Sequence, residues 1–124
     1  MTACLPRLLI ATVAIVIGIP SPDGFAQDAS AIKGVLHIAG KTPVDPPPNE
    51  PKRTHAYLTI QGRGAVDMYR AMRARPANDV CRGEGWTIKR AGPLTCALAR
   101  DGKEAECDFA IEVATGRLAT GNAC

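Results

Sequence analysis

The clearest chemistry in this 124-residue chain lies in four cysteines of its C-terminal half, Cys81, Cys96, Cys107 and Cys124. An even number of cysteines in a small exported domain is typical of disulfide bonds. No Cys-x-x-Cys pair occurs and both histidines are remote in sequence, which disfavours a zinc site. The sequence therefore predicts two disulfides, with no metal and no cofactor.

Residues 27–124 offer little for nucleophilic catalysis. Their single serine, Ser30, has no Gly-x-Ser-x-Gly context. Four paired cysteines would leave no free thiol to act as a nucleophile. The motif Gly62-Arg63-Gly64 precedes an expected helix, but two glycines at such a junction are typical of a turn rather than of a phosphate cradle. We predict that the protein is not an enzyme.

A candidate polar site contains His55 and Tyr57, which share one face of an expected strand. Asp79, Glu84 or Asp108 would be acidic partners for the imidazole, although no pattern in the sequence brings them to it. The alternative function is therefore a small periplasmic hydrolase that uses His55, or a thiol-redox enzyme that uses a labile disulfide.

Positive charge gathers in the middle of the chain, whose net charge is +3. The candidate binding surface consists of Arg63, Arg70, Arg73, Arg75, Arg82, Lys89 and Arg90. Such a surface suits an acidic protein or an anionic polymer. Nucleic acid is not an expected partner, because the chain carries an export signal.

That signal occupies residues 1–26. Arg7 precedes the apolar run from Leu8 to Ile19, and Gly24-Phe25-Ala26 places small residues at a cleavage site. The run is shorter than the roughly 20 residues of a membrane-spanning helix. We expect cleavage after Ala26, a periplasmic or secreted location, and a mature chain (27–124) that forms one domain without a membrane span.

The elements that position these residues follow from hydrophobic periodicity. Strands are expected at 33–39, 54–61, 86–90 and 117–120, and a proline-rich loop at 42–53. Residues 65–75 predict a helix, because Ala65, Met68, Tyr69 and Met72 form an apolar stripe. Residues 78–85 predict a loop that carries Cys81.

A β-hairpin is expected from Leu94 to Val113, with its turn at Asp101-Gly102. A two-residue turn there places Cys96 opposite Cys107, at a hydrogen-bonded pair whose side chains are less close. A similar turn at Thr115-Gly116 places Cys107 opposite Cys124, at a closer non-hydrogen-bonded pair. We therefore prefer the bridges Cys81–Cys96 and Cys107–Cys124; Cys96–Cys107 with Cys81–Cys124 is the alternative.

The order of elements predicts an α+β domain, with one antiparallel sheet of about four to six strands and a single helix packed on it. Three segments, HAYLTIQG…MYRAM (55–72), CRG…IKRAGPLTC (81–96) and ECDFAIEV (106–113), resemble small uncharacterised exported proteins of Gram-negative bacteria. This resemblance implies export. It implies no activity and no functional residue.

The function we expect is that of a non-catalytic binding module for a protein or an anionic envelope polymer. An inhibitor of a hydrolase is one version of this function, by analogy with other small disulfide-linked domains. A structural envelope component that associates with itself is a third possibility.

Overall fold

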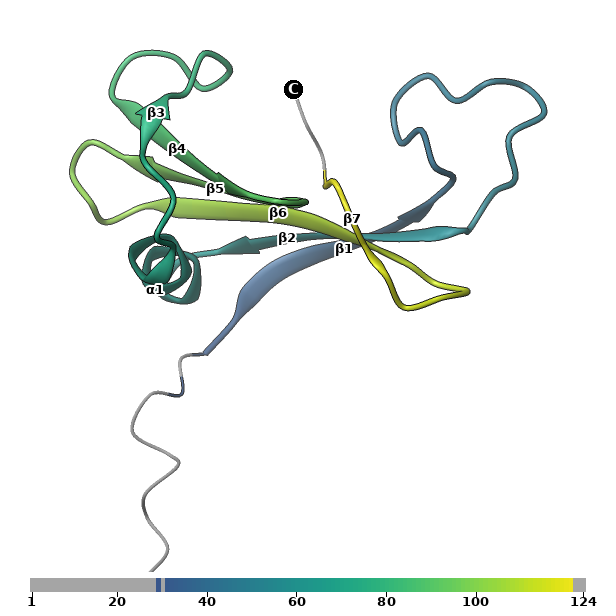
Figure 1. Ribbon diagram of the computed structural model, residues 1–124, viewed down its shortest axis with the longest axis horizontal. Coiled ribbons are helices and arrows are strands. Elements are labelled where there is room, and N and C mark those ends of the chain that lie inside the picture. Colours follow the sequence, from purple (N-terminus) through teal and green to yellow (C-terminus); the bar gives the residue numbers. More distant parts are fainter. Residues whose placement is uncertain (1–28, 30, 122–124) are drawn as a thin grey trace, which may run out of the picture.

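The computed structural model describes residue 29 and residues 31–121; the expected signal peptide, Ser30 and Cys124 lie outside this part. An antiparallel sheet carries one helix on one of its faces (Figure 1). In chain order the elements are β1 (Lys33–Ala39), β2 (His55–Gln61), α1 (Arg63–Ala71), β3 (Ala77–Asn78), β4 (Trp86–Ala91), β5 (Leu94–Ala99), β6 (Ala105–Glu112) and β7 (Leu118–Ala119). The predicted α+β class, with one sheet and one helix in the described residues, is confirmed.

The strands follow the order β1-β2-β6-β5-β4-β3, and β7 pairs with β6 as a branch. The sheet thus has seven strands, one more than the expected upper number. The additional strand is β3, which pairs Ala77 with Ile88 and Asn78 with Thr87, so Asn78 is in a strand and not in the loop expected at 78–85. A strand of two residues is too short to leave a periodic pattern in the sequence.

The helix begins and ends earlier than its predicted bounds of 65–75. It follows Gly62, whose φ of 73° is a left-handed conformation that glycine adopts readily. At its other end Met72 is already extended. The ammonium of Lys89 donates hydrogen bonds to the carbonyl oxygens of Tyr69 (3.0 Å) and Met72 (2.8 Å). A cation there satisfies carbonyls that a helix end leaves without partners, so Lys89 stabilises this end.

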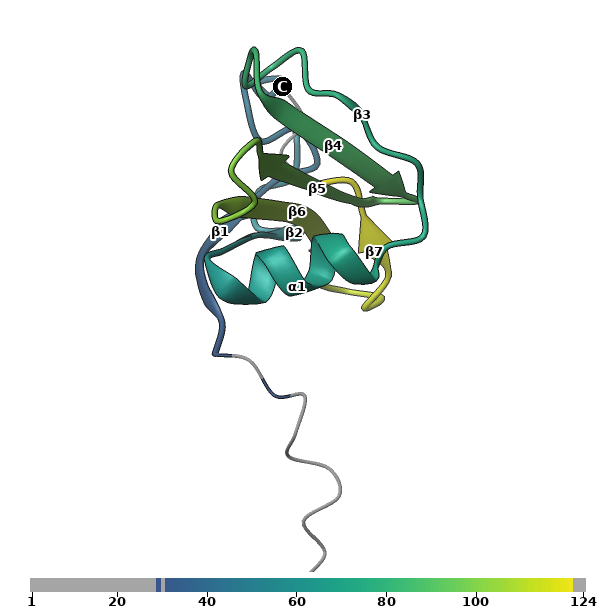
Figure 2. The ribbon, with the colours of Figure 1, turned by 90° about the vertical axis from the view of Figure 1, so that its left-hand side faces the viewer.

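The core lies between α1 and the central strands β2, β5 and β6 (Figure 2). Its buried members are Ile60, Ala65, Val66, Tyr69, Cys96, Ala105 and Cys107. Met68 and Met72 pack against them, so the predicted apolar stripe of the helix is confirmed. The two cysteines are completely buried.

A disulfide joins Cys96 to Cys107. The preferred pairing of Cys81 with Cys96 and of Cys107 with Cys124 is therefore wrong, although the predicted register, with Cys96 opposite Cys107, is confirmed. The error lies in the length of the turn. The Ala99 amide donates a hydrogen bond to the Glu104 carbonyl (2.9 Å), so these two residues close the loop, whereas a two-residue turn would be closed by Arg100 and Lys103. Because hydrogen-bonded pairs alternate, the cysteines then occupy a non-hydrogen-bonded pair, with their Cα atoms 4.0 Å apart.

The register of the last strand also differs from the prediction. Glu112 donates its amide to the carbonyl of Arg117 (2.8 Å), whereas a two-residue turn would have paired Ala114 with Arg117. The loop therefore spans residues 113–116, two more than the expected turn and both on the β6 side, and the partners of β7 shift by two positions along β6. The sequence argument for a bridge between Cys107 and Cys124 therefore no longer holds.

The proline-rich loop between β1 and β2 is tied to the sheet by hydrogen bonds. Glu50 accepts the amide of Thr42 (2.6 Å), and this bond holds the pKa of Glu50 below its usual value. The hydroxyl of Tyr57 donates to the carbonyls of Gly40 (3.0 Å) and Lys41 (2.8 Å). The loop is thus fixed at both of its ends.

Candidate functional site: a carboxylate cluster and the helix arginines

The face of the sheet opposite the helix carries polar side chains on β2 and β6. The register sets Thr59 beside Asp108 and Gln61 beside Glu106. Since side chains alternate along a strand, Glu106 and Asp108 share this face, whereas Cys107 between them points into the core. Two carboxylates thus lie side by side on one face of a central strand.

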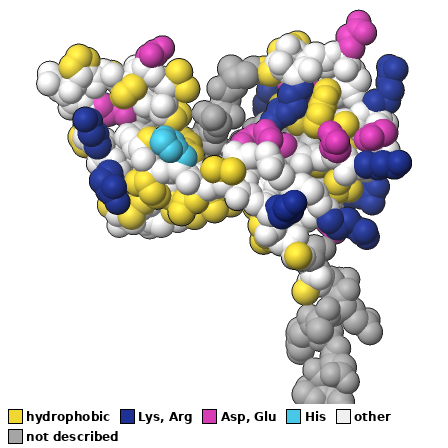
Figure 3. All heavy atoms as spheres, turned by 180° about the vertical axis from the view of Figure 1, so that it is seen from behind, with side chains coloured by type: hydrophobic (Ala, Val, Ile, Leu, Met, Phe, Trp, Pro, Cys, Tyr) yellow, Lys and Arg dark blue, Asp and Glu magenta, His cyan; other side chains and the backbone are white. Residues whose placement is uncertain are grey.

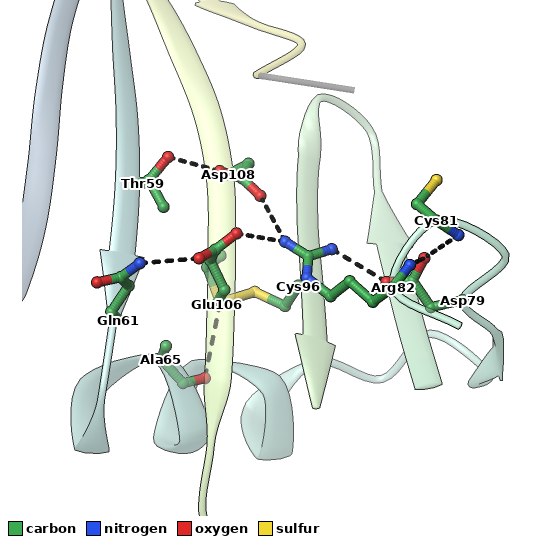
Figure 4. Close-up of polar contacts among 10 residues, drawn as sticks. Thr59, Gln61, Ala65, Asp79, Cys81, Arg82, Cys96, Glu106 and Asp108 are labelled. Carbon is green, nitrogen blue, oxygen red and sulfur yellow. Dashed lines mark hydrogen bonds and ion pairs between the residues drawn. A yellow bond between two sulfur atoms is a disulfide. The ribbon is translucent and has the colours of Figure 1, made fainter. Parts of the chain in front are cut away.

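Arg82 reaches these carboxylates from the loop after β3 (Figure 4). Its Nη2 contacts Glu106 Oε1 and lies 3.5 Å from Asp108 Oδ2, and its Nη1 lies 3.0 Å from Asp79 Oδ2. The guanidinium also stands over the ring of Trp86, at 5.7 Å from its centroid. We call Asp79, Arg82, Glu106 and Asp108 the carboxylate cluster. The single guanidinium group of Arg82 therefore contacts three carboxyl side chains.

Asp79 holds the loop in place. Its Oδ1 accepts the backbone amides of Cys81 (3.0 Å) and Arg82 (3.3 Å), and the residue is only 3% exposed. Burial by itself would raise the pKa of Asp79, but the bonds from the Cys81 amide and from Arg82 outweigh it and lower that pKa. Asp79 is thus held as a carboxylate.

The pKa of Asp108 shifts in the opposite direction to that of Asp79. It is 5% exposed, and this burial raises the pKa of its carboxyl, with Glu106 adding to the effect. A bond from the Thr59 hydroxyl (2.7 Å) and the guanidinium of Arg82 act against the rise without cancelling it. The cluster therefore contains two buried carboxyl groups whose pKa values move apart.

A cavity of about 290 Å³ adjoins the cluster and is lined in part by Asp79, Arg82, Arg90, Thr95 and Asp108. In the part of the chain that the structure describes, no buried side-chain nitrogen or oxygen lacks a hydrogen-bond partner. No group of three or more potential metal ligands occurs among the described residues either. Through these contacts the carboxylate cluster holds the loop of residues 79–85 against β6.

The residues of the predicted basic surface do not lie together in the structure. Arg82 belongs to the carboxylate cluster, and Lys89 binds the end of α1. Arg90 follows Lys89 in a strand, so its side chain is on the opposite face, at the cavity. Of the seven residues, Arg82 and Lys89 thus bind different parts of the structure, and Arg90 lines a cavity.

The other four residues of that set, Arg63, Arg70, Arg73 and Arg75, lie on α1 and the segment after it, and all four are exposed. We call them the helix arginines. Arg63 is 3.5 Å from Asp67, an ion pair within one helical turn. Among the described residues, no ion pair involves the other three. Seen from behind, several basic side chains gather toward the end of the molecule that holds α1, with acidic ones among them (Figure 3).

His55 and Tyr57 are neighbours on β2, with ring centroids 6.0 Å apart. Nδ1 of His55 lies 2.9 Å from the hydroxyl of Thr54, and the residue pairs with Glu112 across the ladder. It lines a separate cavity of about 320 Å³ with Lys41, Glu112 and Arg117. The structure thus puts His55 beside Glu112 rather than with the acids considered from the sequence.

Sequence reasoning missed the carboxylate cluster because it treated Arg82 as a surface residue. Two signals were present. Aspartate followed by two loop residues and an arginine suits a turn in which the side chain accepts backbone amides. Carboxylates at alternate positions of a central strand need a cation from elsewhere, because a buried charge without a partner is costly.

Within the described residues, no helix has both the length and the apolar character needed to cross a bilayer. Comparison of the chain with protein-family models, with curated proteins and with solved structures finds no match.

Proposed function

We propose that the protein is an exported, non-catalytic binding module that recognises an anionic envelope polymer through the helix arginines. The observation that carries this proposal is the exposure of Arg70, Arg73 and Arg75, which make no ion pair with any described residue. Export rests on the signal-like residues 1–26, with cleavage after Ala26.

The placement of these arginines favours a polymer over a small anion. They follow one another along the helix and the segment after it, and neither the cavity at the carboxylate cluster nor the one at His55 is lined by Arg70, Arg73 or Arg75. An extended row of guanidinium groups matches phosphate or carboxylate groups repeated along a chain. An acidic protein surface is the second candidate target.

Redox catalysis by the described disulfide is disfavoured, because Cys96 and Cys107 are both fully buried. Thiol exchange requires access of the attacking thiolate to a sulfur atom. This supports a structural role for the bridge and a non-catalytic function for the domain.

We expect the triple variant Arg70→Gln/Arg73→Gln/Arg75→Gln to bind lipopolysaccharide at least about tenfold more weakly than the wild type at low salt, because three phosphate contacts are lost. Isothermal titration, and the salt concentration that elutes the protein from heparin–agarose, measure this loss.

The matched control is Lys41→Gln/Lys52→Gln/Arg53→Gln, which removes three exposed charges between β1 and β2. It should bind within about twofold of the wild type. Equal weakening by both variants would mean that only net charge matters, and would contradict a surface made by the helix arginines.

We also propose a second disulfide between Cys81 and Cys124. Cys81 is not a free thiol. Thr120 and Gly121 line the same cavity as Cys81, and a Cβ on Gly121 would clash with the backbone nitrogen of Phe109. The chain therefore crosses β6 in close contact. Cys124 is the third residue after Gly121, a reach of about 10 Å.

Trypsin tests this pairing directly, because it separates the four cysteines into residues 74–82, 91–100, 104–117 and 118–124. Without reduction, mass spectrometry should find 74–82 joined to 118–124, and 91–100 joined to 104–117. The intact mass should correspond to a chain that begins at Gln27 and lacks four hydrogens. A peptide 74–82 that reacts with an alkylating reagent before reduction would refute the second bridge.

A further inference from the structure

The two outer edges of the sheet differ in how they are protected. At one edge, β3 has only two residues and follows Pro76, so it offers little backbone for another strand to pair with. At the other edge, β1 has seven residues and pairs over its full length with β2. The strand contains no proline and one charged residue, Lys33. A long edge without protection is a template for pairing with another strand.

The side chains of β1 are also unusually exposed for their type. Val35 is 63% exposed, Leu36 is 61% exposed and Ile38 is 37% exposed. Leu36 lies beside Leu58, which lies beside Phe109, so an apolar row runs across three strands and ends at the free edge. The row has no protein neighbour beyond Leu36 in the part of the chain described.

We infer that β1 pairs antiparallel with β1 of a second copy of this chain, about a twofold axis beside Leu36. Identical antiparallel strands are related by a twofold axis perpendicular to the sheet, so the interface is the same surface on both copies. The two apolar rows then meet at Leu36 and become continuous. The inference does not depend on the proposed binding of a polymer.

The sequence of β1 suits antiparallel pairing with an identical strand in this register. Gly34 faces Ile38 of the second copy, so no two bulky side chains meet at this pair. Val35 faces His37. Lys33 faces Ala39, so the only formal charges of β1 do not meet each other. Like charges opposite each other would have opposed such a pairing.

A variant that puts like charges at the axis tests the inference. Leu36→Lys places two ammonium groups next to each other in the pair, and it should fold, because the side chain is mostly exposed. Sedimentation equilibrium of the exported wild-type protein over a wide range of concentrations should show a reversible dimer. The dissociation constant should rise at least about tenfold in Leu36→Lys.

Val113→Lys is the matched control, because Val113 is also exposed (56%) but lies after β6. It should dimerise as the wild type does. Amide hydrogen exchange of β1 should slow as the concentration of wild-type protein rises, and this dependence should vanish in Leu36→Lys. A wild-type protein that stays monomeric, or a Leu36→Lys variant that dimerises normally, would overturn the inference; so would pairing of β1 with a different partner strand.

Discussion

Replacing Cys96 and Cys107 together by alanine is expected to lower the free energy of unfolding by about 3–4 kcal/mol. The disulfide closes a loop across a sequence separation of 11 residues. A loop of this size is worth about 3 kcal/mol in the chain-entropy description. The lost sulfur atoms leave a void between α1 and the sheet, where both cysteines are fully buried, which adds to the cost. Chemical denaturation followed by circular dichroism measures the change.

The variant Cys96→Val/Cys107→Ala separates the two contributions, because it restores part of the volume without restoring the covalent bond. It should recover roughly 1 kcal/mol of the loss. A double alanine variant with a stability within about 0.5 kcal/mol of the wild type would show that the buried bridge is not a main support of the fold.

Replacing Arg82 by methionine should destabilise the protein by about 2–3 kcal/mol at neutral pH. The change leaves Asp79 and Asp108 buried without their cation, and removing one member of a buried ion pair is costly. We place the loss below that of a fully buried pair, because the Arg82 side chain is 25% exposed. Urea denaturation at several pH values measures it.

The size of this loss should depend on pH. Asp79 has a lowered pKa in the folded wild type, so its ionised form stabilises the fold, and that gain disappears as the pH falls through the folded pKa. Asp108 has a raised pKa, so the cost of ionising it is present above that pKa and is relieved on acidification. Without the guanidinium of Arg82, both carboxyls would have a higher pKa than in the wild type. The variant should therefore approach the wild type as the pH falls from 7 toward 4 and below.

Arg90→Met is the control, since Arg90 lines the same cavity but is exposed and forms no ion pair with a described residue. Its stability should stay within about 0.5 kcal/mol of the wild type. A loss in Arg82→Met that is the same at pH 7 and at pH 4 would show that packing, rather than charge, accounts for the role of Arg82.

Local patterns in the sequence predicted most of the secondary structure. The strand at 33–39 and the opposition of Cys96 and Cys107 followed from alternation and from the Asp-Gly turn, both of which act over a few residues. Whether two facing residues form a hydrogen-bonded or a non-hydrogen-bonded pair depends on which residue pair closes the loop of the hairpin. A shift of the closing pair by one position on each strand reversed the choice of disulfide.

The carboxylate cluster could not be predicted in the same way. Arg82 is 24 residues from Glu106 and 26 from Asp108, and the three meet only because the loop after β3 folds across β5 onto β6. Likewise, the role of Lys89 depends on the end of α1, which lies close enough to β4 for the ammonium to bond the carbonyls of Tyr69 and Met72. Contacts of this kind depend on the packing of whole elements, which a single sequence does not encode as a periodic pattern.

The position of the buried bridge within one hairpin also bears on how the chain oxidises. The partners of Cys96–Cys107 are closer in sequence than those of any other pairing considered, and the turn brings them together before distant strands must meet. β-Hairpins form in about 1–10 µs, far faster than a disulfide is made. The hairpin therefore presents its two thiols to each other first. Once they are joined, the remaining pair of cysteines in residues 27–124 has a single way to combine, and the chain avoids a search among three pairings.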